Sequence, residues 1–570
     1  MNATATNAGR LAASLQRNGV RYVFGQSNPP SITLACADIG IEQIGYRQEN
    51  AGTYMAQAYG MCTQTIPVVT AQHGPAATLL VPGLAESLKA SYPIVALVEE
   101  IGLNHVDKNA FQEIDHQTLF QGVTKWVKRI PTQERVEEYV DRAFAIAGSG
   151  RPGPVVLLCP KDIFNDFHKY PVNMKRVGGH STFPLDRFSP DKQTIAQAAK
   201  LILSAKRPLI YAGGGVISSQ AIAELRALQD DFSIPVATTT MGKGAVDEEH
   251  PLSIGPIGYY MGKTAVGHFH KPMIQQSDLI LLVGNRTNQN GTDTWSLLPE
   301  EATYIHIDID PEEIDRNYPS VRMIGDAKAT LQALYDALQA TGANPFQHQR
   351  ANIEKTIQTA KDYHTEAIQS LIQDNPNTMN METFLRKIDP LLDNDSVIVA
   401  DASLSSVWNA NYLTARASRK FIFPRGLAGL GWGLPMAMGA KLANPRKKVF
   451  CLVGDGGFAH VWSELETCKR HGIEIVVVVI NNQILGYQKL SETVAFNRST
   501  NVCDFSAVDH TKIAEACGLQ GIKLDQVSDI YDTMTAAFQH EGTVVIDLIA
   551  NPDNIPPVAS MESYKREVTT

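Results

Sequence analysis

The sequence has no C-x-x-C pair among its seven cysteines, no long basic run and no window of ~18 uncharged apolar residues that would cross a bilayer. With a net charge of −9, the lack of a basic run argues against nucleic acid as a partner. Several cysteines lie in apolar runs, which is typical of buried thiols in a reducing compartment. The first ten residues lack the charged-then-apolar order of a signal peptide. We therefore expect a cytoplasmic protein without a membrane segment.

Length and patterning indicate several α/β domains. The 570 residues are too many for one core, so two to four domains are expected. Three blocks alternate short apolar runs with helical patterns, which is typical of parallel sheets that bind ligands at the carboxyl ends of their strands. The predicted fold class is α/β, with three doubly wound parallel-sheet domains. We place them at residues 1–175, 190–345 and 375–555, followed by a tail at 556–570.

The runs assigned to buried strands are short and are bounded by glycine, proline or polar residues. They include residues 22–24, 66–70, 93–98, 208–212, 279–283 and 304–309. A polar, helix-prone stretch at 347–374 connects the second block to the third. The first and third blocks have similar patterns, although we find no tandem repeat.

The third block contains the most specific local pattern. One apolar run ends in Gly-Asp-Gly-Gly at 454–457, and the next ends in Asn-Asn at 481–482. Asp455 and Asn482 are 482 − 455 = 27 residues apart, the length of one strand–helix–strand unit, so we expect both at the same sheet edge. Carboxylate and amide oxygens suit Mg²⁺ with phosphate as a further ligand, and glycines let the backbone approach phosphates. The alternative is an ordinary crossover with a glycine-rich turn.

Two residues of the first block stand just beyond strand-like runs. Glu49 lies at the start of an Ala-rich helix pattern, where a carboxylate is commonly a first-turn residue stabilised by the helix dipole. His73 lies in Gln-His-Gly-Pro at a strand-to-helix turn. It is either a proton relay or a ligand for a substrate carboxylate, or else a structural histidine with its hydrogen bonds satisfied.

The ordered motifs resemble the thiamine-diphosphate enzymes of the acetolactate synthase type. One such string alone is weak, but the set is specific because it covers all three blocks in order. The strings are Gln48-Glu49 before a small-residue helix, Ala-Phe-Gln-Glu at 110–113, Thr-Lys-Trp at 124–126, Gly-Arg-Pro-Gly-Pro at 150–154, Pro-Lys-Asp at 160–162, Ile-His-Ile-Asp-Ile-Asp-Pro at 305–311, Gly-Trp-Gly-Leu-Pro at 431–435 and the Gly-Asp-Gly and Asn-Asn pair. The resemblance implies a pyrimidine-binding first domain, a central domain and a diphosphate-binding third domain.

The resemblance also implies roles for individual residues. Glu49 would hydrogen-bond the aminopyrimidine ring and serve as the acid–base carboxylate, with burial raising its pKa. Asp455, Asn482 and the Ile484 carbonyl would bind Mg²⁺. Further contacts with thiamine diphosphate are implied for Ser403, Ser405, Ala428, Leu430, Gly456, Gly457, Leu485, Gly486 and Tyr487. Because Glu49 and the diphosphate site would come from different subunits, a homodimer or homotetramer with interfacial active sites is implied.

Departures from the synthase pattern bear on the substrate. Asn28 and Pro29 occupy the place of a Gly-Gly turn that faces the reacting carbonyl. Proline has no N–H to offer there, whereas the Asn28 amide does. A tryptophan expected near Ser491 is absent, and His73 stands where a small residue is expected. The predicted reaction is therefore decarboxylation or carboligation of a different 2-oxo acid.

Asn28, Glu49, His73 and Gln112 are the candidate catalytic residues. Phe111 is a substrate-pocket candidate by position, and Lys125 is either a pocket residue or a solvated surface charge.

Alternative functions differ in cofactor or in class. A 2-hydroxyacyl-CoA lyase or an oxalyl-CoA decarboxylase would share the cofactor, but no clear basic cluster for CoA phosphates is present. A nicotinamide or flavin oxidoreductase would need G-x-G-x-x-G, and the second block, with Gly-Gly-Gly-Val-Ile-Ser at 213–218, lacks the last glycine. A non-catalytic homologue is opposed by the intact Glu49, Asp455 and Asn482. The glycine turn, Arg286 and Asp308 are compatible with FAD or ADP in the central domain or with a purely structural role.

Overall fold

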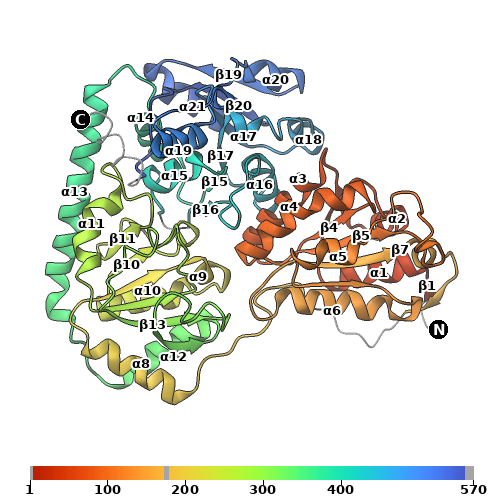
Figure 1. Cartoon of the computed structure of the whole chain (residues 1–570), viewed down its shortest axis with the longest axis horizontal. Coiled ribbons are helices and arrows are strands. Elements are labelled where there is room, and N and C mark those ends of the chain that lie inside the picture. The colour runs from red at the N-terminus through yellow and green to blue at the C-terminus, as the bar shows by residue number, and fades with distance from the viewer. Residues whose placement is uncertain (1–3, 173–178, 417, 559–570) are drawn as a thin grey trace.

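Three six-stranded parallel sheets organise the computed structural model, which describes residues 4–172, 179–416 and 418–558. The N-terminal domain lies at the right of Figure 1, the central domain at the lower left and the C-terminal domain above them. The predicted fold class, α/β with three parallel-sheet domains, is thereby confirmed. The limits 1–175, 190–345 and 375–555 stay a prediction, and residues 559–570 of the predicted tail lie outside the described residues.

The N-terminal sheet has the order β3–β2–β4–β5–β7–β6, and every neighbouring pair is parallel. Most of its strands are continuous buried runs because helices cover both faces. The strands are β2 (Tyr22–Phe24), β3 (Glu42–Ile44), β4 (Val68–Ala71), β5 (Val95–Glu100), β6 (Trp126–Arg129) and β7 (Val155–Pro160). The helices are α1 (Asn7–Arg17), α2 (Pro30–Asp38), α3 (Glu49–Thr63), α4 (Pro75–Ala90), α5 (His116–Gln121), α6 (Val136–Gly148) and α7 (Lys161–Phe164). A short antiparallel pair, β1 (Thr4–Ala5) and β8 (Tyr170–Pro171), lies outside this sheet.

The C-terminal sheet has the order β16–β15–β17–β18–β20–β19 and is also parallel throughout. In chain order both sheets read second, first, third, fourth, sixth, fifth, so the similarity of the two sequence blocks reflects one shared topology. The strands are β15 (Val397–Ala400), β16 (Lys420–Ile422), β17 (Val449–Gly454), β18 (Val476–Asn481), β19 (Gln520–Leu524) and β20 (Val544–Ile549). The helices are α14 (Met381–Ile388), α15 (Leu404–Tyr412), α16 (Gly433–Ala443), α17 (Asp455–Phe458), α18 (Glu464–His471), α19 (Gly486–Phe496), α20 (His510–Ala516) and α21 (Ile530–Gln539).

The central sheet has a different order, β11–β10–β9–β12–β13–β14, which is the arrangement of doubly wound nucleotide-binding folds. The strands are β9 (Pro208–Ala212), β10 (Val236–Thr238), β11 (Ser253–Pro256), β12 (Leu279–Val283), β13 (Thr303–Asp308) and β14 (Ser320–Ile324). The helices are α8 (Lys192–Ser204), α9 (Gly214–Ser218), α10 (Ile222–Phe232), α11 (Val266–Gln275) and α12 (Ala327–Ala340). The polar connection forms α13 (Arg350–Asp374), which runs along the edge of the molecule up to the C-terminal domain (Figure 1).

In each sheet the chain adds strands first to one side of its first strand and then to the other, and ligands bind in the crevice beyond such a reversal of strand order. The reversal lies between β2 and β4 in the N-terminal sheet, between β9 and β12 in the central sheet, and between β15 and β17 in the C-terminal sheet. The segments that follow these strands are therefore the first places to look for a site.

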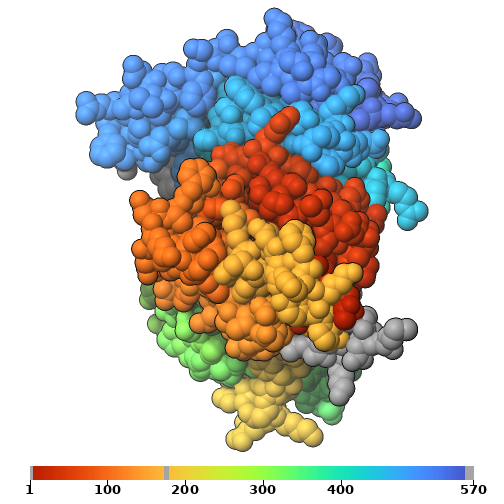
Figure 2. Space-filling model, turned by 90° about the vertical axis from the view of Figure 1, so that its right-hand side faces the viewer, coloured from red at the N-terminus to blue at the C-terminus, as the bar shows by residue number. Residues whose placement is uncertain are grey.

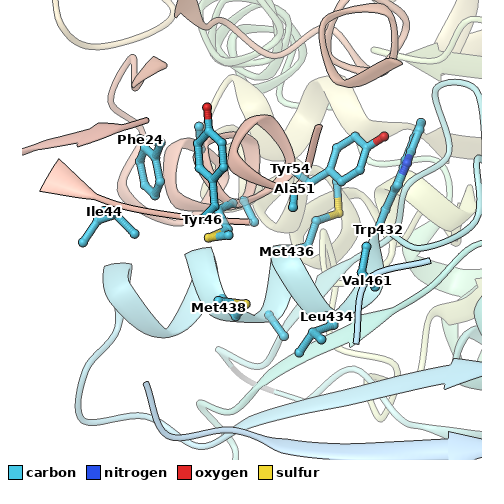
Figure 3. Close-up of a cluster of buried hydrophobic side chains, with 14 of the residues drawn as sticks. Phe24, Ile44, Tyr46, Ala51, Tyr54, Trp432, Leu434, Met436, Met438 and Val461 are labelled. Atoms are coloured by element: carbon cyan, nitrogen blue, oxygen red, sulfur yellow. The ribbon is translucent and has the colours of Figure 1, made fainter. Parts of the chain in front are cut away.

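The N- and C-terminal domains share a buried core. Helix α3 crosses α16 closely, and a side chain on Gly439 would come within 2.0 Å of the Met55 carbonyl oxygen. The rings of Tyr54 and Trp432 contact each other beside this crossing, with centres 4.6 Å apart and planes tilted by 38° (Figure 3). Figure 2 shows the C-terminal domain resting on the N-terminal domain, with the central domain below. Residues far apart in the sequence therefore meet across this contact.

Candidate active site

Asp455 lies at the carboxyl end of β17, beside the end of β18. Gly454 is opposite Ile480 in the parallel ladder, so Asp455 and Asn482 both follow the same edge of the sheet. One carboxylate oxygen of Asp455 accepts the N–H of Gln483 at 2.7 Å, and the other accepts the N–H of Gly456 at 2.7 Å. Burial raises the pKa of this carboxyl, and the same main-chain donors oppose the rise. The carboxylate is thus fixed next to Asn482.

The glycines around Asp455 serve different purposes. A side chain on Gly457 would come within 2.1 Å of a carboxylate oxygen of Asp401, whereas one on Gly454 would meet nothing within 4 Å. The turn is therefore packed on one side and open on the other. One carboxylate, one amide oxygen and an open glycine turn fit a hard cation that carries phosphate. Within the described part of the chain, no group of three His, Cys, Asp or Glu could hold a metal, so carbonyl, water or phosphate oxygens would have to complete its shell.

The two adjacent asparagines have different surroundings. Asn481 is buried, and its side-chain amide donates to Asp547 at 2.8 Å and to the Val508 carbonyl at 3.0 Å. Its role is structural. Asn482 is partly exposed and lies next to Asp455, where its amide oxygen can face a ligand. The sequence motif alone does not separate these roles.

The segment that follows Asn482 leads into α19. Ile484 forms an isolated bridge with Asp504, and the Leu485 N–H donates to the Cys503 carbonyl at 2.7 Å. Gly486 begins the helix, and Tyr487 in its first turn is 39% exposed. These four predicted cofactor residues thus form one continuous strip beside the Asp455 turn.

The loop at 426–433 is anchored on Asp401, a residue that the sequence analysis did not single out. Asp401 is buried after β15 and accepts the N–H groups of Gly431 and Trp432, each at 3.0 Å. Ala428 in this loop has a φ of +60°, a conformation that costs a residue with a side chain of order 1 kcal/mol or more. Leu430 is half-buried.

Ser403 and Ser405 lie at the N-terminus of α15. Ser403 precedes the helix with a φ of +65°, and Ser405 is buried in the first turn. The free N–H groups of a helix start favour an anion, which suits the predicted diphosphate contacts.

A second missed carboxylate holds the other end of the 426–433 loop. Glu86, on α4 of the N-terminal domain, is buried and accepts the N–H of Gly426 at 2.7 Å and the N–H of Leu427. Burial raises the pKa of Glu86, while these donors and the N–H of Ala428 oppose the rise. The loop is therefore fixed by carboxylates from two domains.

Glu49 is the first residue of α3, and the main chain before it is held by the C-terminal domain. Glu464 on α18 accepts the N–H of Arg47 at 3.0 Å and that of Gln48 at 3.1 Å. Burial raises the pKa of both Glu49 and Glu464. Glu49 thus has the helix-start position of a dipole-stabilised carboxylate and also the raised pKa expected of an acid–base group. The sequence analysis did not find Glu464.

The remaining candidates of the N-terminal domain follow β2, β4 and β5. The Asn28 amide donates to the Gln26 carbonyl at 3.3 Å. His73 is buried, and its Nδ1 lies 3.0 Å from a carboxylate oxygen of Glu99. Gln112 has a φ of +62°, and its buried side-chain oxygen has no hydrogen-bond partner among the described residues.

Phe111 and Lys125 differ in their environment. Phe111 is 83% exposed in the loop after β5. Lys125 donates to the Ile146 and Ser149 carbonyls at 2.6 and 2.8 Å, at the C-terminus of α6, and burial lowers its pKa to about 8. Lys125 is thus tied to a helix end, which is neither a freely solvated charge nor a pocket position.

A cleft that is partly open to solvent lies at the strand-order reversal of the central sheet. Its lining includes Gly213, Gly284, Arg286, Asp308, Arg151 and Arg425. A side chain on Gly213 would come within 2.1 Å of the Gly284 carbonyl, so this glycine is also needed for packing. Burial raises the pKa of Asp308 to about 7, and the Arg425 Nε is buried without a partner among the described residues.

Comparison with known proteins identifies the domains. Family models of the thiamine pyrophosphate enzymes match residues 6–119 (N-terminal TPP binding domain), 195–334 (central domain) and 401–548 (C-terminal TPP binding domain). A probable acetolactate synthase large subunit of Methanocaldococcus jannaschii is 31% identical over 571 residues, covering 96% of this chain and 92% of the relative. An acetolactate synthase of Arthrospira platensis is 31% identical over 569 residues, covering 96% and 94%.

A third relative is the probable acetolactate synthase large subunit of Methanococcus aeolicus, 31% identical over 532 residues, covering 90% of this chain and 87% of the relative. The names of these relatives favour the synthase-type resemblance over the acyl-CoA lyase alternative. No helix of the described residues is long and apolar enough to cross a membrane. The chain therefore belongs to the thiamine pyrophosphate-dependent enzymes, in the family of the acetolactate synthase large subunits.

Proposed function

We propose that the protein is a thiamine-diphosphate- and Mg²⁺-dependent decarboxylase or carboligase that acts on a 2-oxo acid other than the substrates of the acetolactate synthases. The observation that carries this proposal is the Asp455 turn, where a fixed carboxylate stands beside Asn482 and an open glycine. When bound, thiamine diphosphate supplies a carbon nucleophile for the 2-oxo carbonyl and an electron sink for the departing carbon dioxide.

The residues of the C-terminal domain would hold the diphosphate end. Asp455 and Asn482 would bind Mg²⁺ through their side chains, and Ile484 would bind it through its carbonyl oxygen. The main-chain N–H of Gly457 and the side chains of Ser403 and Ser405 would donate to phosphate oxygens, and the N–H of Gly456 would do so in place of its bond to Asp455. The strip from Ile484 to Tyr487 would close over this end.

Glu49 would serve the pyrimidine end. A carboxyl group with a raised pKa, fixed at a helix start, can share a proton with a ring nitrogen and return it. The Ala428 carbonyl would accept from the ring's amine, and Leu430 would pack against the cofactor. Glu86, Asp401 and Glu464 support this role because they fix the main chain on both sides.

The substrate side of the site supports a difference from the synthases. Asn28 and Pro29 replace the glycine turn, His73 replaces a small residue, and the side-chain oxygen of Gln112 is buried without a hydrogen-bond partner among the described residues. These groups would orient the carboxylate and carbonyl of the 2-oxo acid. A screen of 2-oxo acids, each with and without an aldehyde acceptor, identifies the substrate and shows whether it is cleaved or ligated.

Calorimetric titration tests the cofactor assignment. Thiamine diphosphate should bind the wild-type protein only with Mg²⁺, and Asp455→Asn should weaken binding about 100-fold because a metal-ligand charge is lost. Asp191→Asn, which alters an exposed helix cap on α8, should bind like the wild type. Glu49→Gln should lower turnover about 100-fold or more. Wild-type protein that binds no thiamine diphosphate, or turnover that survives Glu49→Gln unchanged, would contradict the proposal.

We also propose a homodimer or homotetramer in which each active site combines Glu49 of one subunit with Asp455 of another. Large apolar side chains are exposed in the loops of both half-sites, namely Phe111 at 83% and Leu427 at 52%. Burial of such groups against a second copy is favourable. Mixing inactive Glu49→Gln and Asp455→Asn proteins should restore up to about a quarter of the wild-type activity if subunits exchange freely. No recovery after refolding the mixture would contradict shared sites.

The central cleft supports a nucleotide, FAD or ADP, as an additional ligand. The cleft lies where doubly wound sheets bind nucleotides, and Arg286 and Arg425 offer positive charge to phosphates. An absorbance scan of purified protein distinguishes the two nucleotides, because only the flavin absorbs visible light.

The absence of a disulfide among the described residues, where all seven cysteines are free, supports a cytoplasmic location.

A further inference from the structure

Two buried histidine–glutamate pairs lie side by side at the carboxyl edge of the N-terminal sheet. His73 follows β4, and its Nδ1 lies 3.0 Å from Oε2 of Glu99 at the end of β5. His116 begins α5, and its Nδ1 lies 3.7 Å from Oε1 of Glu100, the next residue of β5. All four side chains are buried. Because their chemistry and burial are alike, their differences are informative.

The pairs differ at the second ring nitrogen. Nε2 of His116 accepts the N–H of Gly74 at 2.9 Å, so this ring is committed to the main chain. Nε2 of His73 makes no hydrogen bond to any residue in the described part of the chain. With Nδ1–H directed at the Glu99 carboxylate, Nε2 of His73 is the nitrogen that can take up and release a proton.

The charges around the two pairs also separate their roles. Lys161 on α7 places its Nζ 3.5 Å from the same Glu99 oxygen that faces His73. Glu100 instead forms a bidentate ion pair with Arg129 on β6. Glu99 therefore faces one imidazole and one ammonium group, whereas Glu100 is largely taken up by a guanidinium.

His73 lies at the place where a ligand is expected. It follows β4, one of the two strands that flank the reversal of strand order, and Asn28 follows the other strand, β2. Gly74 packs against Gln112 so closely that a side chain on this glycine would come within 2.7 Å of the Gln112 Cβ. His73 is therefore next in sequence to a glycine that packs against Gln112, whose side-chain oxygen has no partner among the described residues.

We propose that Glu99 holds His73 as the proton donor of the reaction, so that an aldehyde is released. This inference rests on the proposed 2-oxo acid activity. The bond between the carbonyl carbon and the carboxylate breaks, carbon dioxide leaves, and the electron pair of that bond ends in a new C–H bond whose proton comes from Nε2 of His73. His73 is then reprotonated from solvent, and the net reaction is RCOCOO⁻ + H⁺ → RCHO + CO₂. Glu99 is a positioning residue that stabilises the protonated imidazole.

The test measures aldehyde and ligated ketone separately, using the full-length protein with thiamine diphosphate, Mg²⁺ and the 2-oxo acid identified by the screen. His73→Gln should lower aldehyde release about 100-fold, and with an aldehyde acceptor the product should shift toward the ligated ketone. Glu99→Gln should lower kcat about tenfold with little change in KM.

Glu100→Gln is the matched control because it removes the neighbouring buried carboxylate, which faces His116, the histidine whose Nε2 already bonds to the main chain. Glu100→Gln should lower stability but keep kcat and the ratio of aldehyde to ligated ketone. If Glu99→Gln does not fold, Glu99→Asp, which withdraws the carboxylate from Nδ1, gives the same comparison. In the cofactor-free protein, a double-mutant cycle of His73→Gln and Glu99→Gln on unfolding free energy should show coupling between the two residues.

The possible outcomes separate this inference from the proposed function. Wild-type protein without cofactor binding or 2-oxo acid turnover overturns both. Wild-type protein that turns over but forms only ligated ketone, or His73→Gln protein that releases aldehyde at the wild-type rate, overturns the proton-donor role alone. Additive effects in the double-mutant cycle overturn the pairing with Glu99. Unchanged affinity of the His73→Gln protein for thiamine diphosphate, together with lost aldehyde release, supports the proton-donor role of His73.

Discussion

Replacing Glu86 by glutamine tests whether a carboxylate of the N-terminal domain positions the cofactor loop of the C-terminal domain. Glu86 is fully buried and accepts two main-chain N–H groups, from Gly426 and Leu427. A hydrogen bond to a charged group contributes about 1.5–3 kcal/mol. Glutamine retains one acceptor oxygen, and its amino group would face the second N–H donor. That N–H is then left buried without a partner.

The substitution should remove the free energy of the second hydrogen bond and part of that of the first, and removal of a buried charge should offset some of this loss. We estimate about 2 kcal/mol. If this energy fixes the loop that carries Ala428 and Leu430, affinity for thiamine diphosphate should fall roughly 30-fold, since 1.4 kcal/mol corresponds to a factor of ten. Calorimetric titration of thiamine diphosphate in the presence of Mg²⁺ measures this change.

Glu382→Gln provides the control. Glu382, on α14 of the C-terminal domain, is also buried and accepts a hydrogen bond from Asn554 at 2.9 Å. The substitution should lower the melting temperature without changing cofactor affinity. The reasoning is refuted if folded Glu86→Gln protein binds thiamine diphosphate as tightly as the wild type, or if Glu382→Gln weakens binding equally.

Two further predictions concern stability. Burial lowers the pKa of His270 to about 3. Between about pH 6.5 and pH 3 this histidine is therefore protonated in the unfolded chain but neutral in the folded protein, so stability falls as the pH drops through this range. Both ring nitrogens of His270 are buried without a partner among the described residues. His270→Leu should therefore raise the melting temperature and shift acid unfolding, followed by circular dichroism, to lower pH. An unchanged midpoint of acid unfolding would contradict this. A methyl group on Gly439 would come within 2.0 Å of the Met55 carbonyl, so Gly439→Ala should lower the free energy of unfolding in urea by about 1–3 kcal/mol. Gly472→Ala is the comparison, because this helix-end glycine has open space around it and a φ of +58°. A loss at Gly439 that is equal to or smaller than the loss at Gly472 would show that the helix crossing adapts.

Much of the architecture could be predicted locally. Buried runs such as Leu279–Val283 formed parallel strands because a strand covered on both faces needs apolar side chains in both directions. The spacing of Asp455 and Asn482 placed both at one sheet edge because a strand–helix–strand unit has a nearly fixed length. The ordered motifs also indicated the family, which the matched domain models confirm. These features depend on residues close in sequence or on their order along the chain.

The residues that hold the site in place could not be predicted in this way. Glu86 meets a loop 340 positions later, and Glu464 binds the main chain 416 positions earlier. His73 and His116 carry no local signal that tells the free imidazole from the committed one. Only the packing of α3 and α4 against the C-terminal domain, and of α5 against Gly74, decides which polar atoms are used and which remain free. The sequence by itself therefore determined the strands, their order along the chain and the cofactor motif. The tertiary structure decided which buried carboxylates support them, because those contacts form between domains whose relative placement no local pattern encodes.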